Sequence, residues 1–320
     1  MTFQITSEDV DKRLDAFLAE KITDWSRAKL QKLIDEGEIT VNEKNVKSSY
    51  KLHENDEIEA DLIINDDERF EPENIPLDVI FEDETLIVIN KPAGIIIHPG
   101  AGNQNGTLAN ALAYHFNLTD LTLENVDGEL SRIEKIKSKI GIVHRLDKET
   151  SGLIVVAKNE RAHENLAKQF RQREVYKSYI ALAHGATRAE YGTIDAQITR
   201  DRTNRLRMAI SKTGRTSLSL WKVRRRFERF TLLDVNIKTG RTHQIRVHLA
   251  SIKHPVVGDE VYNGGRDKTI PDVKIRTAIA HLNRFFLHAE RLNFKHPRTG
   301  EMMEFTAPLP KELLELLEVV

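Results

Sequence analysis

Hydrophobic and polar positions near the N-terminus predict a small unit of two helices and two strands. Apolar residues recur at helical spacing over 14–18 and over 30–34, and Ser26 stands before the second run as a suitable helix N-cap. Two short extended segments follow at 39–41 and 57–62. We therefore expect these residues to form one compact unit.

Downstream of residue 78, short runs of β-branched and other apolar residues predict many strands and few helices. The predicted strands are 85–90, 140–144, 153–157, 179–183, 193–198, 205–210, 216–227, 230–237, 284–287 and 301–305. The predicted helices are 107–116, 160–171, one that Thr242 caps, and 311–317. Adjacent strands with few helices between them favour an α+β fold over a doubly wound α/β fold. We expect a mixed, mainly antiparallel sheet flanked by helices.

The segment between these two patterns is acidic and contains prolines, which keep a linker extended. We predict an N-terminal domain over 1–64, an acidic linker over 65–77 and a larger domain over 78–320. Residues 118–139 are charged and weakly periodic, which predicts a surface loop.

The composition excludes several classes of chemistry. The 320 residues include no cysteine, which excludes disulfide bonds, cysteine nucleophiles, zinc fingers and thiolate-bound iron–sulfur clusters. Residues 1–9 lack the pattern of a signal peptide, and the longest apolar runs, such as 153–157, are far too short to span a bilayer. We expect a cytoplasmic protein that does not enter a membrane.

The charge is balanced in total and uneven along the chain. The net charge is -1, from 48 Lys and Arg against 49 Asp and Glu, which taken alone argues against nucleic-acid binding. However, residues 54–84 hold 14 acids and one base, whereas residues 200–229 hold 11 bases and two acids. Most of those bases are arginines, which suit bidentate phosphate contacts and stacking on bases. This second stretch fits either a nucleic-acid contact or a charged, solvated hairpin edge.

Polar and charged residues cluster in the loop 144–152, between two predicted strands. Asp147 has basic neighbours at Arg145 and Lys148. A carboxylate beside fixed cations stays ionised, which suits a nucleophile or an electrostatic stabiliser. The same pattern also fits an aspartate that caps a turn through Thr150, and the residues alone leave both interpretations open.

Two further segments carry candidate chemistry. Strand alternation puts Lys177 and Tyr179 on one face, where Tyr179 either packs in the sheet or stacks on a base. Segment 239–248 opens a helix at a glycine with arginine and polar side chains, which is typical of an anion site. His243 and His248 are five positions apart, whereas a helical metal pair usually needs a spacing of about four, so we expect no metal.

Four segments, in order, resemble the motifs of the RluA-type pseudouridine synthases, which modify RNA. The segments are INKPAGIIIHPG, HRLDKETSGLIVVAKN, YKSYIAL and TGRTHQIRVHLA. Upstream of them, RLDAFLAEK and SRAKLQKLIDEGEITVN resemble an S4-type RNA-binding domain. The resemblance covers most of residues 11–310.

This resemblance implies an α+β catalytic domain behind an S4-like domain. It also implies isomerisation of specific uridines to pseudouridine in large-subunit (23S) ribosomal RNA, without cofactor or metal. Asp147 would be the nucleophile, and Arg246 would pair with it. Tyr179 would pack against the flipped uracil, and Arg145 would help to hold the flipped state.

The partner implied is ribosomal RNA or a pre-ribosomal particle, and we expect a monomer. The candidate RNA-binding residues, besides Arg145, are Arg241, His243 and Gln244 in the catalytic domain and Arg13, Ser26, Arg27, Lys29 and Lys32 in the S4-like domain. Three other functions stay open: a non-catalytic RNA-binding ribosome-assembly factor, a synthase acting on transfer RNA, and a metal-dependent RNA hydrolase.

Overall fold

The computed structural model describes residues 2–22, 27–60, 71–99, 103, 105–118, 140–201, 203–204 and 207–320. The chain divides into two compact units, a first unit Met1–Arg69 and a second unit Phe70–Val320. The predicted loop 118–139 lies outside the described residues apart from Leu118, and so do residues 65–70 of the predicted linker.

The first unit packs two helices on a small antiparallel sheet. Its elements are β1 (Thr2–Gln4), α1 (Leu14–Lys21), α2 (Arg27–Glu36), β2 (Ile39–Val41) and β3 (Glu57–Ala60). The sheet order is β1-β3-β2, so β3, which pairs on both sides, lies between the other two strands. The apolar positions that predicted the helices form the core, with Leu14, Phe17 and Leu30 fully or almost fully buried. The predicted cap Ser26 lies outside the described residues.

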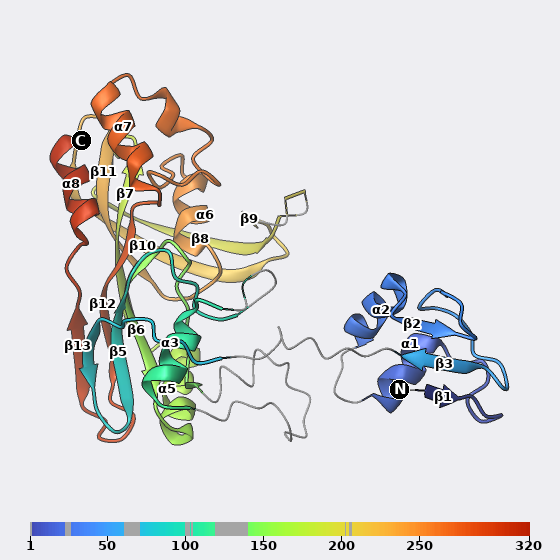
Figure 1. Cartoon of the computed structure of the whole chain (residues 1–320). Helices are drawn as coiled ribbons and strands as arrows, with labels where there is room; N and C mark the ends of the chain where they lie inside the picture. Colours follow the sequence, from blue (N-terminus) through green and yellow to red (C-terminus); the bar gives the residue numbers. More distant parts are fainter. Residues whose placement is uncertain are drawn as a thin grey trace. The chain divides into compact units, whose positions relative to one another are not determined.

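The second unit is built on one large twisted sheet (Figure 1). Its strands are β4 (Val79–Glu82), β5 (Leu86–Lys91), β6 (Ser151–Ala157), β7 (Tyr176–His184), β8 (Tyr191–Arg200), β9 (Met208–Ile210), β10 (Arg215–Arg226), β11 (Phe230–Ile237), β12 (Leu287–Lys295) and β13 (Met302–Thr306). The order is β4-β5-β6-β12-β7-β11-β10-β8-β9, with β13 beside β12. Strands β6 and β12 run parallel, whereas the other recorded strand pairs are antiparallel. The predicted mixed, mainly antiparallel α+β fold is confirmed.

Helices cover both faces of this sheet. They are α3 (Leu108–His115), α5 (Glu160–Gln172), α6 (Gln244–Ser251), α7 (Val273–Leu282) and α8 (Lys311–Val319), with a short 3-10 turn η2 (Arg266–Thr269). Helices α3 and α6 pack on the central core, while α7 and α8 pack together on the opposite side of β7 and β11. Strand alternation explains this division: on β7, for example, Ala181 faces the first core and Leu182 the second.

The structure corrects the predicted strand 140–144. Gly141 has φ +76°, and a Cβ there would lie 1.9 Å from the carbonyl oxygen of Ala157, so the chain turns closely against β6. Only Ile142 forms an isolated bridge with β6. The main-chain N–H of Val155, which a neighbouring strand would use, donates instead to Nε2 of His144 at 3.0 Å. A side chain therefore replaces the expected strand pairing.

Two other boundaries differ from the prediction. Helix α6 begins at Gln244, with His243 rather than Thr242 as its N-cap, and His243 has a left-handed backbone (φ 55°). The strand predicted over 284–287 was wrong, because β12 starts at Leu287 and Arg284 lies in the preceding turn. Helix α7 and strand β4 were not predicted. The apolar residues of α7 at 275, 278, 279 and 282 do stand at helical spacing and pack in the core, so this helix had a signal in the sequence. Strand β4 exposes Val79 and Ile80 and shows no alternation.

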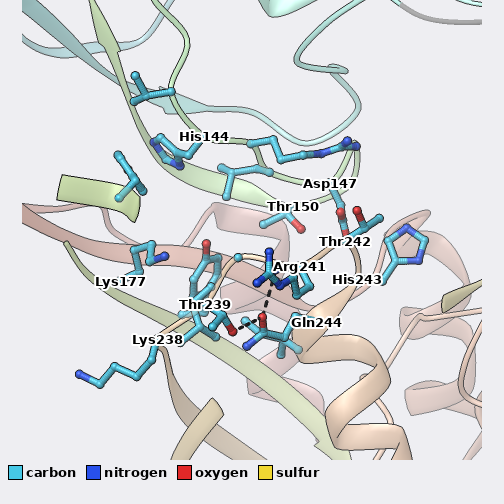
Figure 2. A pocket seen from close by; sticks show the side chains of 18 of the residues that line it. His144, Asp147, Thr150, Lys177, Lys238, Thr239, Arg241, Thr242, His243 and Gln244 are labelled. Carbon is cyan, nitrogen blue, oxygen red and sulfur yellow. Dashed lines mark hydrogen bonds between the residues drawn. The ribbon is translucent and has the colours of Figure 1, made fainter. Parts of the chain in front are cut away.

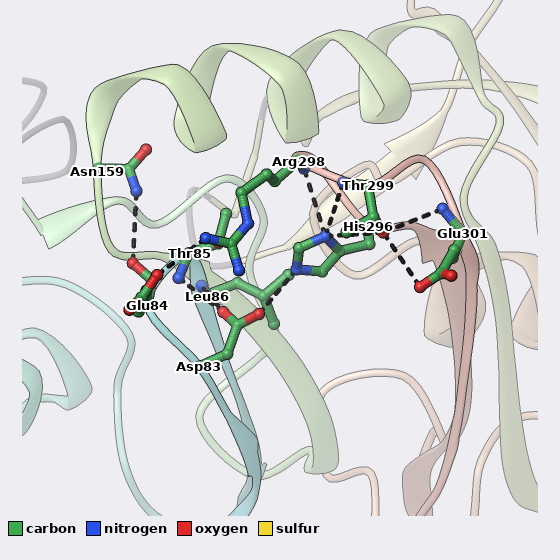
Figure 3. A network of polar contacts seen from close by, with 9 residues as sticks. All are labelled: Asp83, Glu84, Thr85, Leu86, Asn159, His296, Arg298, Thr299 and Glu301. Atoms are coloured by element: carbon green, nitrogen blue, oxygen red, sulfur yellow. Dashed lines mark hydrogen bonds and ion pairs between the residues drawn. The ribbon is translucent and has the colours of Figure 1, made fainter.

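A polar network ties the turn before β5 to the turn that joins β12 and β13 (Figure 3). Asp83 accepts the N–H groups of Thr85 and Leu86 at 2.6 and 2.9 Å, and its second oxygen lies 2.9 Å from Nε2 of His296. His296 is buried, and its other ring nitrogen accepts the N–H of Thr299 at 3.1 Å. This network holds two distant turns together at the periphery of the sheet.

Candidate active site

A pocket of about 560 Å³ opens in the second unit where three motif segments meet. The loop 142–150, the start of β7 and the turn between β11 and α6 line it, as Figure 2 shows. The fold brings these segments together because β6 and β7 both pair with β12, while β11 pairs with β7. Asp147, Tyr179 and Arg246, which the sequence singled out, all line this pocket.

Arg246 joins two carboxylates. Its Nη1 donates to Oδ2 of Asp147 at 3.2 Å, and its Nε and Nη2 donate to the two oxygens of Asp259 at 2.7 and 2.9 Å. Arg246 and Asp259 are buried, whereas the Asp147 side chain keeps 17% of its surface exposed and faces the pocket. The guanidinium is thus fixed by a two-pronged pair and offers its remaining N–H to Asp147.

Two aromatic rings confine the same guanidinium. Arg246 lies 4.3 Å from the ring centre of Phe285 and 5.1 Å from that of Tyr262. Burial disfavours the charge of Arg246, but the hydrogen bonds and charge of Asp259 more than offset this, so the pKa of Arg246 is raised. Arg246 therefore stays charged and cannot swing away from Asp147.

Tyr179 lies on β7 with 7% of its surface exposed. Burial, and then the charge of Asp147, raises the pKa of Tyr179 well above its usual value of 10. The phenol is therefore protonated at neutral pH and can donate a hydrogen bond. Its ring and that of an aromatic ligand could pack together inside the pocket.

Lys91, at the end of β5, contacts the main chain of the loop that carries Asp147. The side chain of Lys91 is fully buried, and its Nζ donates to the carbonyl oxygens of Pro92, Ile95 and Lys148 at 2.7, 3.0 and 3.1 Å. Burial lowers the pKa of Lys91 to about 7, while three carbonyl acceptors match the three donors of the ammonium form. The NKP segment thus positions the Asp147 loop.

His243 stands at the rim of the pocket beside Asp147 and Thr242 (Figure 2). The hydroxyl of Tyr262 accepts the N–H of Met208 at 2.7 Å and lies 2.9 Å from Nδ1 of His243. Burial lowers the pKa of His243, which favours the neutral ring at pH 7.

The other candidate RNA-binding residues of the catalytic domain differ in whether their polar groups are already hydrogen-bonded within the chain. Gln244 is buried, and its amide accepts from Thr239 and Arg241 and donates to Leu218 and Ser219 (Figure 2 draws the first two contacts). Its polar atoms are used inside the chain, which indicates a structural role. Arg145 is exposed, and Arg145 and Arg241 both line the pocket.

In the first unit, two of the predicted RNA-binding arginines share a buried acid. Asp15 accepts paired hydrogen bonds from Arg13 and from Arg27, at 3.0 to 3.2 Å, and a further one from Gln31. Both arginine side chains remain about half exposed. Ser26 and the side chains of Lys29 and Lys32 lie outside the described residues.

Part of the arginine-rich stretch is paired within the fold. Arg224 binds Asp234 and Glu290, and Arg226 binds Glu190. Arg202 and Arg205 lie outside the described residues.

Several residues at or next to the pocket were not predicted from the sequence. Asp259 and Tyr262 come from a loop with no local pattern, so nothing in the sequence marked them as partners of Arg246 and His243. Lys238 also lines the pocket and was not singled out, whereas Lys177, which strand alternation placed on the face of Tyr179, lines it as that alternation indicates.

Within the described part of the chain, no group of three or more His, Asp or Glu residues could hold a metal ion. None of its helices is long and apolar enough to cross a bilayer.

Comparison with known proteins gives consistent results over nearly the whole chain. Residues 12–58 match the S4 domain family, and residues 85–251 match the RNA pseudouridylate synthase family. The chain is 40% identical to the uncharacterized RNA pseudouridine synthase YlyB of Bacillus subtilis, over 98% of this chain and 95% of that protein. It is 38% identical to ribosomal large subunit pseudouridine synthase D of Pasteurella multocida, over 100% and 94%.

A solved structure supports the same assignment. Human RNA pseudouridylate synthase domain containing 1 is 27% identical, with a TM-score of 0.54, over 73% of this chain and 84% of that one. The resemblance found in the sequence is confirmed, and the chain belongs to the RNA pseudouridylate synthase family, with an S4 domain before its catalytic domain.

Proposed function

We propose that this enzyme converts specific uridines of large-subunit ribosomal RNA to pseudouridine, with Asp147 as the nucleophile. The observation that carries the proposal is the 3.2 Å contact between Asp147 and Arg246 in a pocket that Tyr179 also lines. An ionised carboxylate that is aimed by a fixed guanidinium, and open to the pocket, has the properties of a nucleophile.

The reaction is an isomerisation, so it needs no net oxidant or reductant. The bond between N1 of uracil and C1′ of ribose breaks, the base turns, and a bond forms between C5 and C1′. The proton on C5 leaves, and N1 gains one. Asp147 would attack the flipped nucleotide at the sugar or at the base, and would be released when the new bond has formed.

The neighbouring residues would serve this chemistry in distinct ways. Tyr179 would pack against the uracil and donate or relay a proton. Arg246 would pair with the Asp147 carboxylate and keep it aimed into the pocket. Arg145, exposed at the rim, would help to hold the flipped state, for which unstacking costs a few kcal/mol.

The choice of ribosomal RNA is supported by the curated relatives named ribosomal large subunit pseudouridine synthase D, which match over the full length. The S4 unit would supply a further RNA contact, with Arg13 and Arg27 beside its buried acid. We propose that the enzyme acts as a monomer in the cytoplasm, on ribosomal RNA or a pre-ribosomal particle.

Mapping pseudouridines in ribosomal and transfer RNA tests the proposal. RNA from a strain that lacks the gene should lose pseudouridine at particular large-subunit positions, and wild-type protein should restore them. Asp147→Asn should restore none while it binds the RNA with unchanged affinity. Restored sites in transfer RNA would instead identify a transfer RNA synthase, and full complementation by Asp147→Asn would indicate a non-catalytic assembly factor.

A further inference from the structure

Lys177 is a buried cation that reaches the pocket from β7. It lies two residues before Tyr179, on the same face of the strand, and keeps 8% of its surface exposed. Figure 2 shows its side chain on the side of the pocket away from Asp147, with Lys238 and His144 nearby. Its ammonium lies 5.5 Å from the ring centre of Phe170, which packs on the His144 ring at 4.6 Å.

No carboxylate of the described residues is recorded as an ion-pair or hydrogen-bond partner of the Lys177 ammonium. Its charged neighbour is another cation, Lys238, and burial followed by this repulsion lowers the pKa of Lys177 to about 8. His144 is no counter-ion either, because burial lowers its pKa to about 3 and leaves its ring uncharged, and its Nε2 already accepts the N–H of Val155. A buried ammonium without a counter-ion is costly, so a ligand group is the natural partner.

The charge of the whole pocket indicates the chemistry of that ligand group. Seven of its lining residues are Lys or Arg, and Asp147, already paired with Arg246, is the one acidic residue among them. Uracil is neutral, so an excess of positive charge adds little to its recognition. The anionic groups of RNA are its backbone phosphates.

We propose that Lys177, assisted by Lys238, binds the backbone phosphate adjacent to the uridine that is held at Tyr179. The inference rests on the proposed function and adds a positioning residue to it. Residues two apart on a strand are about 6.6 Å apart, so the base and its neighbouring phosphate would lie at successive positions along β7. Phosphate binding here would set the depth to which the flipped nucleotide enters the pocket.

The test uses the full-length enzyme and an RNA fragment that contains one mapped uridine. Lys177→Met keeps the apolar stem and removes the charge, and Lys177→Arg restores it. Lys311→Met removes an exposed charge on α8 as a matched control. We expect Lys177→Met to raise KM roughly tenfold with a much smaller change in kcat, the size of one lost charge-assisted hydrogen bond. Lys177→Arg should recover most of the KM, and Lys311→Met should match wild type.

Two further measurements separate phosphate binding from a structural role. The slope of log KM against log salt concentration should fall by about 0.7 in Lys177→Met and by a smaller amount in Lys238→Met. Lys238 is exposed, so its replacement should leave the fold intact. One neutral methylphosphonate beside the target uridine should raise the KM of wild type and leave that of Lys177→Met unchanged.

Two results would overturn the inference. In the first, the methylphosphonate raises the KM of Lys177→Met as much as that of wild type, whichever of the two phosphates beside the uridine it replaces. In the second, a folded Lys177→Met enzyme has an unchanged KM. A fall in kcat with KM and salt dependence unchanged would also overturn it. Failure of the proposed function looks different, because the wild-type enzyme would then form no pseudouridine in ribosomal RNA.

Discussion

Lys91 donates a hydrogen bond at 3.1 Å to the main-chain carbonyl oxygen of Lys148, the residue directly after Asp147. The N–H of Gly94 donates to the same oxygen at 2.9 Å. Two segments that are 54 to 57 residues apart in sequence are therefore joined directly at the loop that carries the proposed nucleophile.

Replacing this lysine should affect stability and catalysis together. Lys91→Met removes three hydrogen bonds to carbonyl groups. Among the described residues only the carbonyl of Lys148 keeps a second donor, Gly94, and we expect a loss of about 3 kcal/mol in the free energy of unfolding. The kcat should fall as well, because the Asp147 loop loses its support. Urea unfolding measures the first effect and pseudouridine formation the second. Lys274→Met, at an exposed position of α7, should change neither.

The pair between Arg246 and Asp259 should matter more for kcat than for KM. Asp259→Asn removes one charge and weakens the two-pronged grip, so Arg246 becomes free to turn from Asp147. We expect kcat to fall by roughly 10- to 100-fold, as for other supporting partners of a reactive group. Steady-state kinetics tests this, and Glu312→Gln, which loosens an exposed partner of Arg284, serves as control. An Asp259→Asn enzyme with normal kcat would show that Asp147 needs no such support.

Tyr179 should remain protonated across the working range of pH. Because burial and the charge of Asp147 raise its pKa, kcat should show no limb from tyrosine ionisation between pH 6 and about 10. Tyr179→Phe should fold normally and lower kcat if the hydroxyl handles a proton. Comparing pH profiles of the two enzymes tests both points, and a basic limb that vanishes in Tyr179→Phe would contradict the first.

Arginines of the basic stretch should differ in their contribution to RNA binding. Arg224→Met breaks ion pairs with Asp234 and Glu290, so it should lower the melting temperature and leave the salt dependence of RNA affinity unchanged. Arg241→Met, in the pocket, should reduce the slope of log affinity against log salt by about 0.7. Binding titrations at several salt concentrations distinguish them. A reduced slope for Arg224→Met would place that arginine on RNA phosphate.

The first unit should be sensitive to acid through Asp15. Hydrogen bonds from Arg13 lower the pKa of Asp15 most, and those from Arg27 and Gln31 lower it further. Burial opposes them, but the pKa stays well below its usual value. Its contribution to stability is therefore present above about pH 4 and is lost as the pH falls through the folded-state value. Hydrogen exchange of the first unit between pH 6 and 2 would show this, and Asp15→Asn should weaken the unit already at pH 7.

The sequence predicted most of the sheet and the main members of the pocket, for reasons the structure explains. Strand β11 was predicted with its observed ends, 230–237, because it is flanked by a charged turn and a glycine. The segment 140–144 has the same β-branched composition and failed, because the His144 side chain takes the N–H of Val155. Whether a side chain takes the place of a paired strand depends on tertiary contacts, which the local sequence does not show.

The same contrast applies to the pocket. Asp147, Tyr179 and Arg246 stand in motifs whose order resembles a family, so their proximity could be expected. Asp259 lies in a loop where Asp has no local signal, and only the fold brings it to Arg246. Lys177 carried a signal, its position relative to Tyr179, but a lysine on a strand gives no sign of burial until the neighbouring helix α5 is placed.

The second carboxylate on Arg246 has a consequence for the charge of the centre during turnover. When Asp147 forms a covalent bond with the nucleotide, its carboxylate becomes a neutral ester, and a guanidinium paired with Asp147 alone would be left as an isolated cation in a buried place. With Asp259 present, the three protein groups pass instead from one net negative charge to none, while the base of the nucleotide takes up the negative charge that Asp147 gives up. In the covalent intermediate the protein groups would then be neutral together beside an anionic base, and formation of the bond between C5 and C1′ would return the negative charge to Asp147 for the next uridine.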